Sequence, residues 1–161
     1  MTQLQNLSTV FYSAGVQLVS GDFDPSKRRI RSLQFPQRPV RTTKTPRKIL
    51  LIEDNVDGVQ TMVTLLHDMG HRVVFALNGK DALHLAQLMR PDFILLDLGL
   101  PGMNGFEVCE RIKADPILQA TRIIAVTAYG DEEYRNRSKA AGCELHLVKP
   151  VSPRVLEELL G

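Results

Sequence analysis

The chain has 161 residues, of which 43% are hydrophobic, and it carries a formal net charge of +2. This is an ordinary composition for a soluble protein; no apolar run is long enough to cross a membrane, and the first twenty residues lack the parts of a signal peptide. The two cysteines, Cys109 and Cys143, are too few for a disulfide framework and lack metal-ligand spacing. We therefore expect a cytoplasmic protein with buried thiols and no contact with a membrane.

The charge is distributed unevenly along the chain. Residues 1–48 contain nine basic and two acidic residues, whereas residues 49–161 contain eleven basic and sixteen acidic residues. The first segment has no sustained hydrophobic periodicity and carries a basic run at 27–31 followed by scattered prolines. Such a segment buries too little apolar surface to offset its ordering entropy. We predict a flexible basic extension at 1–46, in which 9–19 forms a short strand or helix only when docked, and a folded domain at 47–161.

Short apolar segments alternate with amphipathic segments from Arg47 onward. The apolar segments are KILLIED (48–54), RVVFAL (72–77), DFILLD (92–97), RIIAVTA (122–128) and ELHLVKP (144–150). The helical segments between and after them are 57–70, 78–90, 105–115, 131–142 and 152–161. Gly70 is placed to end the first helix, and Ser152 and Pro153 to begin the last. The alternation predicts a doubly wound α/β domain with a parallel sheet covered by helices on both faces.

Polar residues follow the predicted strands at their carboxyl ends. Glu53 and Asp54 follow the first strand, Asp97 the third, Thr127 the fourth and Lys149 the fifth. Ligands of open α/β sheets bind at this edge. If the first and third strands are neighbours, three carboxylates meet there. Singly, each acid is best explained as a strand-end or helix-capping residue, but the joint pattern favours a functional site.

Three carboxylates at one edge repel each other and need compensation. Two unit charges about 5 Å apart repel by roughly 3 kcal/mol at an effective dielectric constant near 20. Lys149 supplies one positive charge, and a divalent cation would balance the rest. Oxygen ligands without His or Cys favour Mg²⁺, or Mn²⁺, over zinc. This arrangement suits phosphoryl transfer, with Asp97 as nucleophile and with Lys149 and Thr127 contacting the phosphoryl group.

Four separated motifs resemble one known family. IEDN (52–55), DLGLPGMNG (97–105), VTA (126–128) and LVKP (147–150) are similar to the motifs of receiver domains in bacterial two-component response regulators. The resemblance covers 47–161. It implies a five-stranded flavodoxin-like sheet in the order 2-1-3-4-5. It also implies that a histidine kinase or histidine phosphotransfer protein transfers a phosphoryl group to Asp97.

The same resemblance implies roles for the remaining site residues. Glu53 and Asp54 would bind the metal together with Asp97 and the backbone carbonyl of Gly99. Thr127 would be the switch hydroxyl, Lys149 would contact the phosphoryl group, and the Lys149–Pro150 bond would be cis. His146 stands where the family often has the Tyr or Phe that partners the switch threonine. We expect the phosphorylation chemistry to survive this difference, whereas the coupling to an output face is in question.

We therefore predict a signalling phosphoacceptor that is not an enzyme in the ordinary sense. Its own chemistry would be limited to self-phosphorylation and slow self-dephosphorylation. We expect a stand-alone receiver that ends at its fifth helix. It would act by protein contact or by onward phosphotransfer.

Three alternatives remain open at this stage. The chain could be the C-terminal receiver of a hybrid sensor kinase, with residues 1–46 as its linker. It could be a DNA-associated regulator that uses the basic extension, although we expect no nucleic-acid binding because no DNA-binding motif is visible. It could also be a phosphoaspartyl-enzyme hydrolase, which is disfavoured because Gly99 stands where those enzymes place a second aspartate.

Overall fold

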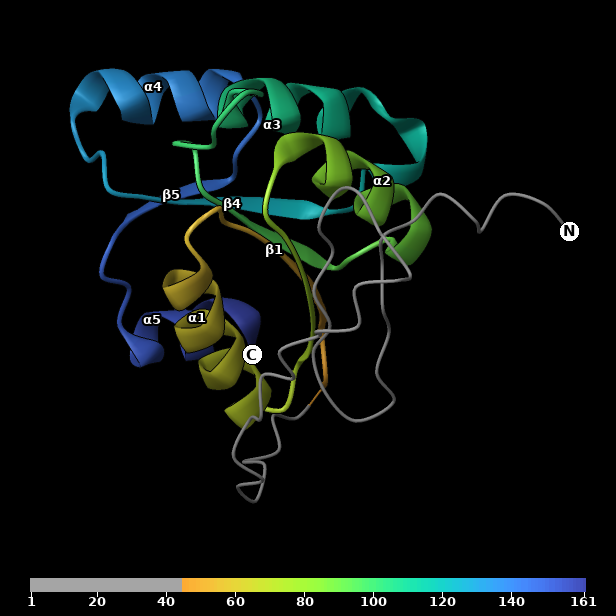
Figure 1. Cartoon of the computed structure of the whole chain (residues 1–161), viewed down its shortest axis with the longest axis vertical. Helices are drawn as coiled ribbons and strands as arrows, with labels where there is room; N and C mark the ends of the chain where they lie inside the picture. Colours follow the sequence, from red (N-terminus) through yellow and green to blue (C-terminus); the bar gives the residue numbers. More distant parts are fainter. Residues whose placement is uncertain (1–44) are drawn as a thin grey trace, which may run out of the picture.

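A five-stranded parallel sheet forms the middle layer of the fold in a computed structural model that describes residues 45–161 (Figure 1). The strands are β1 (Lys48–Ile52), β2 (Arg72–Ala76), β3 (Phe93–Leu96), β4 (Arg122–Thr127) and β5 (Leu145–Val148). Their order in the sheet is β2-β1-β3-β4-β5, which confirms the predicted fold class. The predicted extension at 1–46 lies outside the described residues, apart from its last two positions, so its flexibility and the short element at 9–19 remain predictions.

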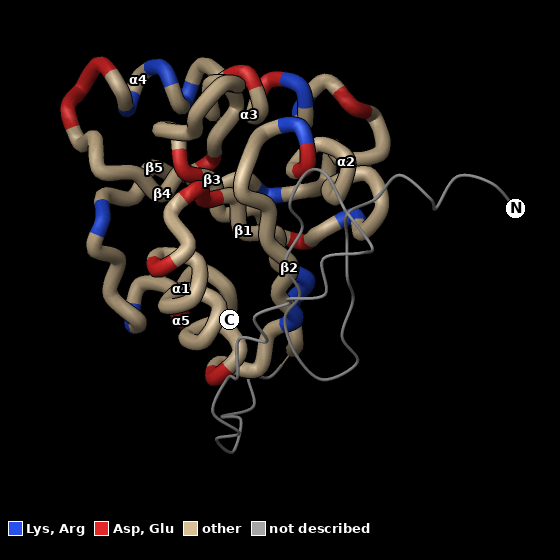
Figure 2. The backbone as a smooth tube through the Cα atoms, in the orientation of Figure 1, with Lys and Arg blue, Asp and Glu red and all other residues tan. Residues whose placement is uncertain are grey.

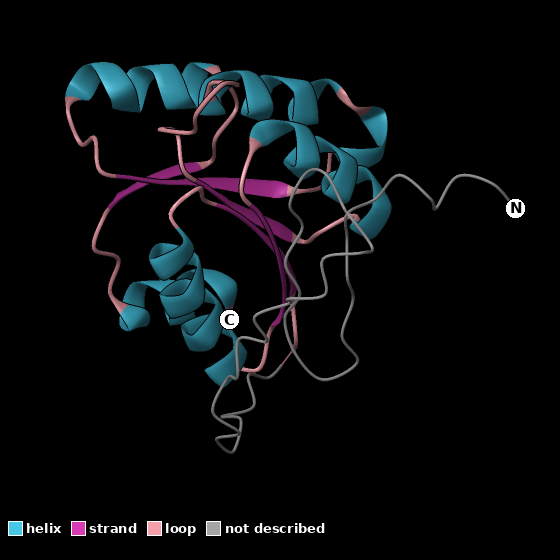
Figure 3. Cartoon of the chain, viewed as in Figure 1, coloured by secondary structure: helices cyan, strands magenta, loops and turns pink. Residues whose placement is uncertain are grey.

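Helices cover both faces of the sheet (Figure 3). One face carries α1 (Val56–Asp68) and α5 (Pro153–Leu160), and the other carries α2 (Gly79–Met89), α3 (Gly105–Ala114) and α4 (Glu132–Ala140). A short 3-10 helix, η1 (Pro116–Leu118), was not predicted; the side chain of Asp115 caps it by accepting the N–H of Ile117. Within residues 45–161, none of the helices combines the length and apolar character that a bilayer span requires.

The ends of the helices follow from local residue chemistry. The Asn55 side chain accepts hydrogen bonds from the N–H groups of Asp57 and Gly58 and so begins α1. The Ser152 side chain accepts from Val155 at the start of α5, where Pro153 occupies the first turn. Gly70 has a φ of 91°, the left-handed conformation that ends α1 as expected.

The two faces of the sheet build two hydrophobic clusters. Leu50 and Ile52 of β1 point into the cluster beneath α2 and α3, and Ile49 and Leu51 into the cluster beneath α1 and α5. This period-two division explains why the central strands are apolar throughout. Burial on both faces does not extend to β5, whose four residues are all partly exposed or exposed, whereas β2 at the other edge of the sheet keeps three of its five residues buried.

The two cysteines lie in the cluster beneath α2 and α3. Cys109 and Cys143 are both buried free thiols, with their sulfur atoms 3.2 Å apart. Their burial confirms the expectation from the sequence.

Strand register brings the predicted site residues to one edge. Beyond β1 and β3, the N–H of Asp97 still donates to the carbonyl of Ile52 at 2.8 Å. Beyond β4 and β5, the N–H of Lys149 donates to the carbonyl of Thr127 at 2.9 Å. The backbone hydrogen bonds between neighbouring strands thus continue past the strand ends. As a result, Asp97 lies beside the end of β1, and Lys149 lies beside Thr127 at the end of β4.

Candidate functional site

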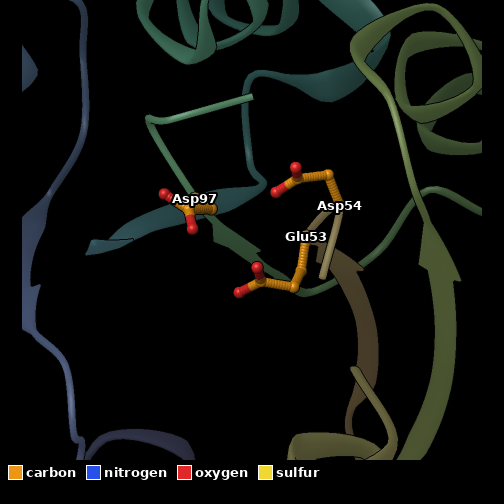
Figure 4. A group of neighbouring side chains, drawn as sticks. All are labelled: Glu53, Asp54 and Asp97. Atoms are coloured by element: carbon orange, nitrogen blue, oxygen red, sulfur yellow. The ribbon is translucent and has the colours of Figure 1, made fainter. Parts of the chain in front are cut away.

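Three carboxylates meet where β1 and β3 end. Oxygen atoms of Glu53, Asp54 and Asp97 all lie within 4.8 Å of one another. Figure 4 shows the three side chains reaching into one region beyond the strand ends, and Figure 2 shows this acidic group against the rest of the backbone. Glu53 is buried and Asp54 is exposed, so the cluster is open to solvent on one side. The predicted meeting of the three acids is confirmed.

Lys149 connects two of these acids. Its ammonium donates hydrogen bonds to Glu53 Oε2 and to Asp97 Oδ2. Burial acts to lower the pKa of Lys149, but the hydrogen bonds to Asp97 and Glu53, together with their charges, outweigh it and raise the pKa above its ordinary value. Lys149 is therefore a permanent cation in this site at neutral pH.

The backbone around Asp97 fixes the position of its carboxylate. The N–H of Gly99 donates to Asp97 Oδ1 at 2.9 Å, so the two oxygens of Asp97 have different partners. Gly105, the first residue of α3, lies so close to the backbone of Asp97 and Leu98 that an added Cβ would come 2.7 Å from the carbonyl oxygen of Asp97. This glycine is required by close backbone approach.

Glu53 is held by one chain neighbour, Asn55, and by Lys149 from the end of β5. Its Oε1 accepts a 3.3 Å hydrogen bond from the N–H of Asn55, while Oε2 accepts from Lys149. Both oxygens of this buried carboxylate therefore have a partner, as buried charge requires.

Thr127 lies at the end of the neighbouring strand β4. Its side chain is fully buried, and its Oγ1 accepts a 3.3 Å hydrogen bond from the N–H of Tyr129. This short turn fixes the start of the loop that leads from β4 to α4. The Lys149–Pro150 peptide bond is cis, as expected.

His146 lies on β5, outside the carboxylate cluster. It is partly buried, as predicted, but its ring does more than pack. Nε2 is 2.7 Å from the carbonyl oxygen of Tyr129, and Nδ1 is 2.9 Å from Ser138 Oγ. Sequence reasoning missed Ser138, since a serine in the polar segment 131–142 carries no signal beyond its place one turn after Tyr134.

The donor set of the cluster suits a hard divalent cation. All its side-chain ligands are carboxylate oxygens, the type that Mg²⁺ and Mn²⁺ prefer. The N–H of Gly99 donates to Asp97, and the role of the Gly99 carbonyl as a further ligand stays a prediction. The residues present therefore fit the predicted metal.

Comparisons with known proteins agree with this geometry. The family description "Response regulator receiver domain" matches residues 49–161. The polar-differentiation response regulator DivK of Brucella anthropi is 38% identical over 118 residues, covering 71% of this chain and 94% of DivK. The transcriptional regulatory protein AfsQ1 of Streptomyces coelicolor is 44% identical over 110 residues, covering 68% of this chain and 47% of AfsQ1, so the chain spans about half of that relative.

Solved structures give the same result. The chemotaxis protein CheY4 of Vibrio cholerae superimposes with a TM-score of 0.68 at 32% identity, covering 72% of this chain and 97% of CheY4. A second solved structure is the receiver domain of the sensor histidine kinase PA1611 from Pseudomonas aeruginosa, which has a magnesium ion coordinated in its active site cleft. It gives a TM-score of 0.67 at 31% identity, covering 72% of this chain and 95% of that receiver. With its sheet order and its strand-end carboxylates already established, the chain belongs to the response regulator receiver domain family.

Proposed function

We propose that this receiver accepts a phosphoryl group on Asp97 and signals through the change that follows. Receiver domains are signalling phosphoacceptors, and one observation supports Asp97 as the acceptor here. Its carboxylate contacts the ammonium of Lys149 and the N–H of Gly99; Glu53 makes contacts of the same two kinds but is buried, whereas Asp97 is only partly buried and so can be reached by a phosphoryl donor. It thus stands between a cation and a backbone donor that can both stabilise developing negative charge.

Glu53, Asp54 and Asp97 would hold Mg²⁺ or Mn²⁺, with the Gly99 carbonyl as a further ligand. When bound, the cation supplies positive charge that neutralises phosphoryl oxygens. Lys149 offsets only one of the three carboxylate charges, so the cluster itself favours a divalent cation. The PA1611 receiver, with its coordinated magnesium, supports this assignment.

The chain's own residues would carry the transfer step. One oxygen of Asp97 attacks the phosphorus atom, and the bond from phosphorus to the donor's nitrogen or oxygen breaks, with the electron pair leaving on the donor. Lys149 releases Asp97 Oδ2 and contacts a phosphoryl oxygen instead. The hydroxyl of Thr127 turns from its local contact with Tyr129 and donates to the same group.

We further propose that the physiological donor is a histidine kinase or a histidine phosphotransfer protein. Both present a phosphorylated imidazole, whose P–N bond is broken in the step above. The signal would then pass by protein contact or by onward phosphotransfer.

Incubation with acetyl phosphate and Mg²⁺ tests the proposal. Intact-mass spectrometry should detect the gain of one phosphoryl group, and Asp97→Asn should abolish it. Asp92→Asn is the matched control, since Asp92 is an exposed aspartate at the opposite end of β3. Undiminished labelling of Asp97→Asn would show that another residue is the acceptor. Equal labelling with and without a divalent cation would show that phosphorylation does not need the proposed metal.

A further inference from the structure

We propose that Cys109 and Cys143 form an oxidant-sensitive dithiol, which closes to a disulfide bond in the folded receiver when hydrogen peroxide is present. The bond would fasten α3 to the turn between α4 and β5. The inference concerns two side chains outside the carboxylate cluster, and it does not rest on the proposed function of Asp97.

The sulfur atoms of the two cysteines are already in contact. Sγ of Cys109 lies 3.2 Å from Sγ of Cys143, although the two residues are 34 positions apart in the chain. A disulfide bond requires about 2.0 Å between its sulfur atoms, so closure brings them together by only about 1 Å. A movement of that size needs small side-chain rotations, and the fold therefore holds each thiol within reach of the other.

The turn that carries Cys143 is held against α3. Gly142 has a φ of 102°, and a Cβ added to it would come 2.8 Å from Cγ of Lys113 in α3. The N–H of Cys143 donates to the carbonyl oxygen of Ser138 at 2.9 Å, which joins the turn to the last residues of α4. These contacts fix the backbone of Cys143, so the closeness of the two sulfur atoms follows from how α3 and the turn pack.

The two thiols have no rival within the chain. The sequence contains two cysteines in all. Both are buried, with 0% of Cys109 and 6% of Cys143 exposed. Burial shields them from a partner as large as a second protein, whereas hydrogen peroxide is close to water in size. The expected product is therefore a disulfide within one chain and not a cross-linked dimer.

Opening of the last turn of α4 gives peroxide access to the pair. Ser138 is the only buried residue among the nine in α4, and seven of the others are exposed. A helix that buries so little surface opens more easily than its neighbours. Because the N–H of Cys143 is bonded to the carbonyl of Ser138, such an opening uncovers Cys143 while α3 stays in place.

The closure is a balanced two-electron oxidation. The thiolate of the first cysteine attacks an oxygen atom of hydrogen peroxide, the O–O bond breaks, and hydroxide leaves behind a sulfenic acid. The sulfur of the second cysteine then attacks the sulfenic sulfur, and the S–O bond breaks as the S–S bond forms. Two thiols and one peroxide thus yield one disulfide and two molecules of water, which carry away both thiol hydrogens.

Cys109 is the better first nucleophile of the pair. The hydrogen bond with Cys143 and the nearby charge of Lys113 lower the pKa of Cys109 below its ordinary value, although burial acts against them. The hydrogen bond with Cys109 and burial raise the pKa of Cys143. Cys109 therefore supplies the thiolate, and Cys143 keeps its proton until the second step.

The bond would make the stability of the receiver depend on redox conditions. It would close a segment that begins in α3, contains β4 and α4, and ends just before β5. A cross-link over 34 positions restricts the unfolded chain much more than the folded one. The oxidised receiver should therefore be harder to unfold than the reduced receiver.

Intact-mass spectrometry of the full chain tests the closure. The folded protein is treated with hydrogen peroxide at neutral pH, then unfolded and alkylated with N-ethylmaleimide. Wild type should be a monomer that is lighter by two hydrogen atoms and takes up no N-ethylmaleimide, and dithiothreitol should restore two alkylation sites. Survival of both thiols, a disulfide between two chains, or an oxygen atom retained on either cysteine would overturn the inference.

Cys109→Ala and Cys143→Ala are the matched variants, since each keeps one of the two thiols. Each should lose its remaining thiol more slowly than wild type loses the pair, because the hydrogen bond between the thiols and the second sulfur are gone. Loss of the single thiol at the wild-type rate in both variants would show that the cysteines react independently and would contradict the proposal. If a variant does not fold, the wild-type products still decide, because the chain contains no third cysteine.

Urea unfolding checks whether the folded receiver accommodates the bond. The midpoint of the oxidised protein should lie about 1–2 M higher than that of the reduced protein. An equal or lower midpoint would overturn the inference, since the bond would then distort the fold. Asp97→Asn should close and gain stability like wild type, so failure of the proposed phosphorylation would leave both measurements valid.

Discussion

The ammonium of Lys149 donates a hydrogen bond to the carboxylate of Glu53, which lies 96 positions earlier in the chain. The same ammonium bonds Asp97, so one cation is shared by acids from two strands. The contact exists because β1, β3 and β5 run parallel and end at one edge of the sheet. Changes to Lys149 must therefore affect both the charge balance of the cluster and the chemistry of Asp97.

Replacing Lys149 by methionine removes the charge and keeps much of the side-chain volume. We expect phosphorylation of Asp97 by acetyl phosphate to slow about 100-fold, the usual effect of losing one charged group that stabilises a transition state. Mg²⁺ should bind about tenfold more tightly, because a positive charge beside the cation site is gone. Stopped-flow kinetics and calorimetric titration measure the two effects. Lys48→Met, at the opposite end of β1, should change neither, and a loss of Mg²⁺ affinity in Lys149→Met would contradict the charge argument.

Replacing Asp54 by asparagine should weaken Mg²⁺ binding by at least about tenfold, since it removes one of three anionic ligands. The fold should remain intact, because Asp54 is exposed. Asp57→Asn, an equally exposed change in the first turn of α1, should bind Mg²⁺ like wild type. Equal affinities of the two variants in a calorimetric titration would mean that Asp54 is not a ligand.

The stability of the domain should fall as the pH drops from 7.5 toward 5, with His71 contributing to the slope. Burial, together with the nearby charge of Arg47, lowers the pKa of His71 from its ordinary 6.5. The unfolded chain therefore binds a proton at a higher pH than the folded chain. Stability is lost as the pH falls through 6.5 toward the lower folded pKa.

Urea unfolding at several pH values checks the role of His71. His71→Asn should flatten the pH dependence over this window, whereas His84→Asn, at an exposed position on α2, should leave it unchanged. Identical slopes in both variants would assign the acid sensitivity to other groups.

Two glycines should respond to alanine in opposite directions. In Gly105→Ala the new Cβ would meet Leu98 Cα at 2.6 Å and the Asp97 carbonyl oxygen at 2.7 Å, so backbone must move. We expect a loss of about 2–3 kcal/mol in unfolding free energy, with slower phosphorylation because Asp97 is displaced. Gly58→Ala meets no atom closer than 3.4 Å in α1 and should raise stability by about 0.5–1 kcal/mol. If denaturant titrations rank the two variants in the reverse order, the backbone of Asp97 and Leu98 does not require a glycine at position 105.

Much of the fold was predictable because its signals are local. Apolar strands, capping residues such as Asn55 and Ser152, and Gly70 act within a few positions of themselves. The meeting of Glu53, Asp54 and Asp97 was predictable for a different reason, since strand ends of a parallel sheet share one edge. Burial along β5 was less predictable, because the sequence LHLV does not state how much of a strand the rest of the chain covers.

The sequence by itself determined the α/β alternation, the family and the identity of the acidic cluster, because periodicity and motif spacing are properties of the chain. Only the tertiary structure decided that Lys149 is shared between Glu53 and Asp97, and that His146 joins Tyr129 to Ser138. Such contacts depend on the distance and direction between side chains of separate elements. Strand register and helix docking set those quantities, and no local pattern of residues encodes them.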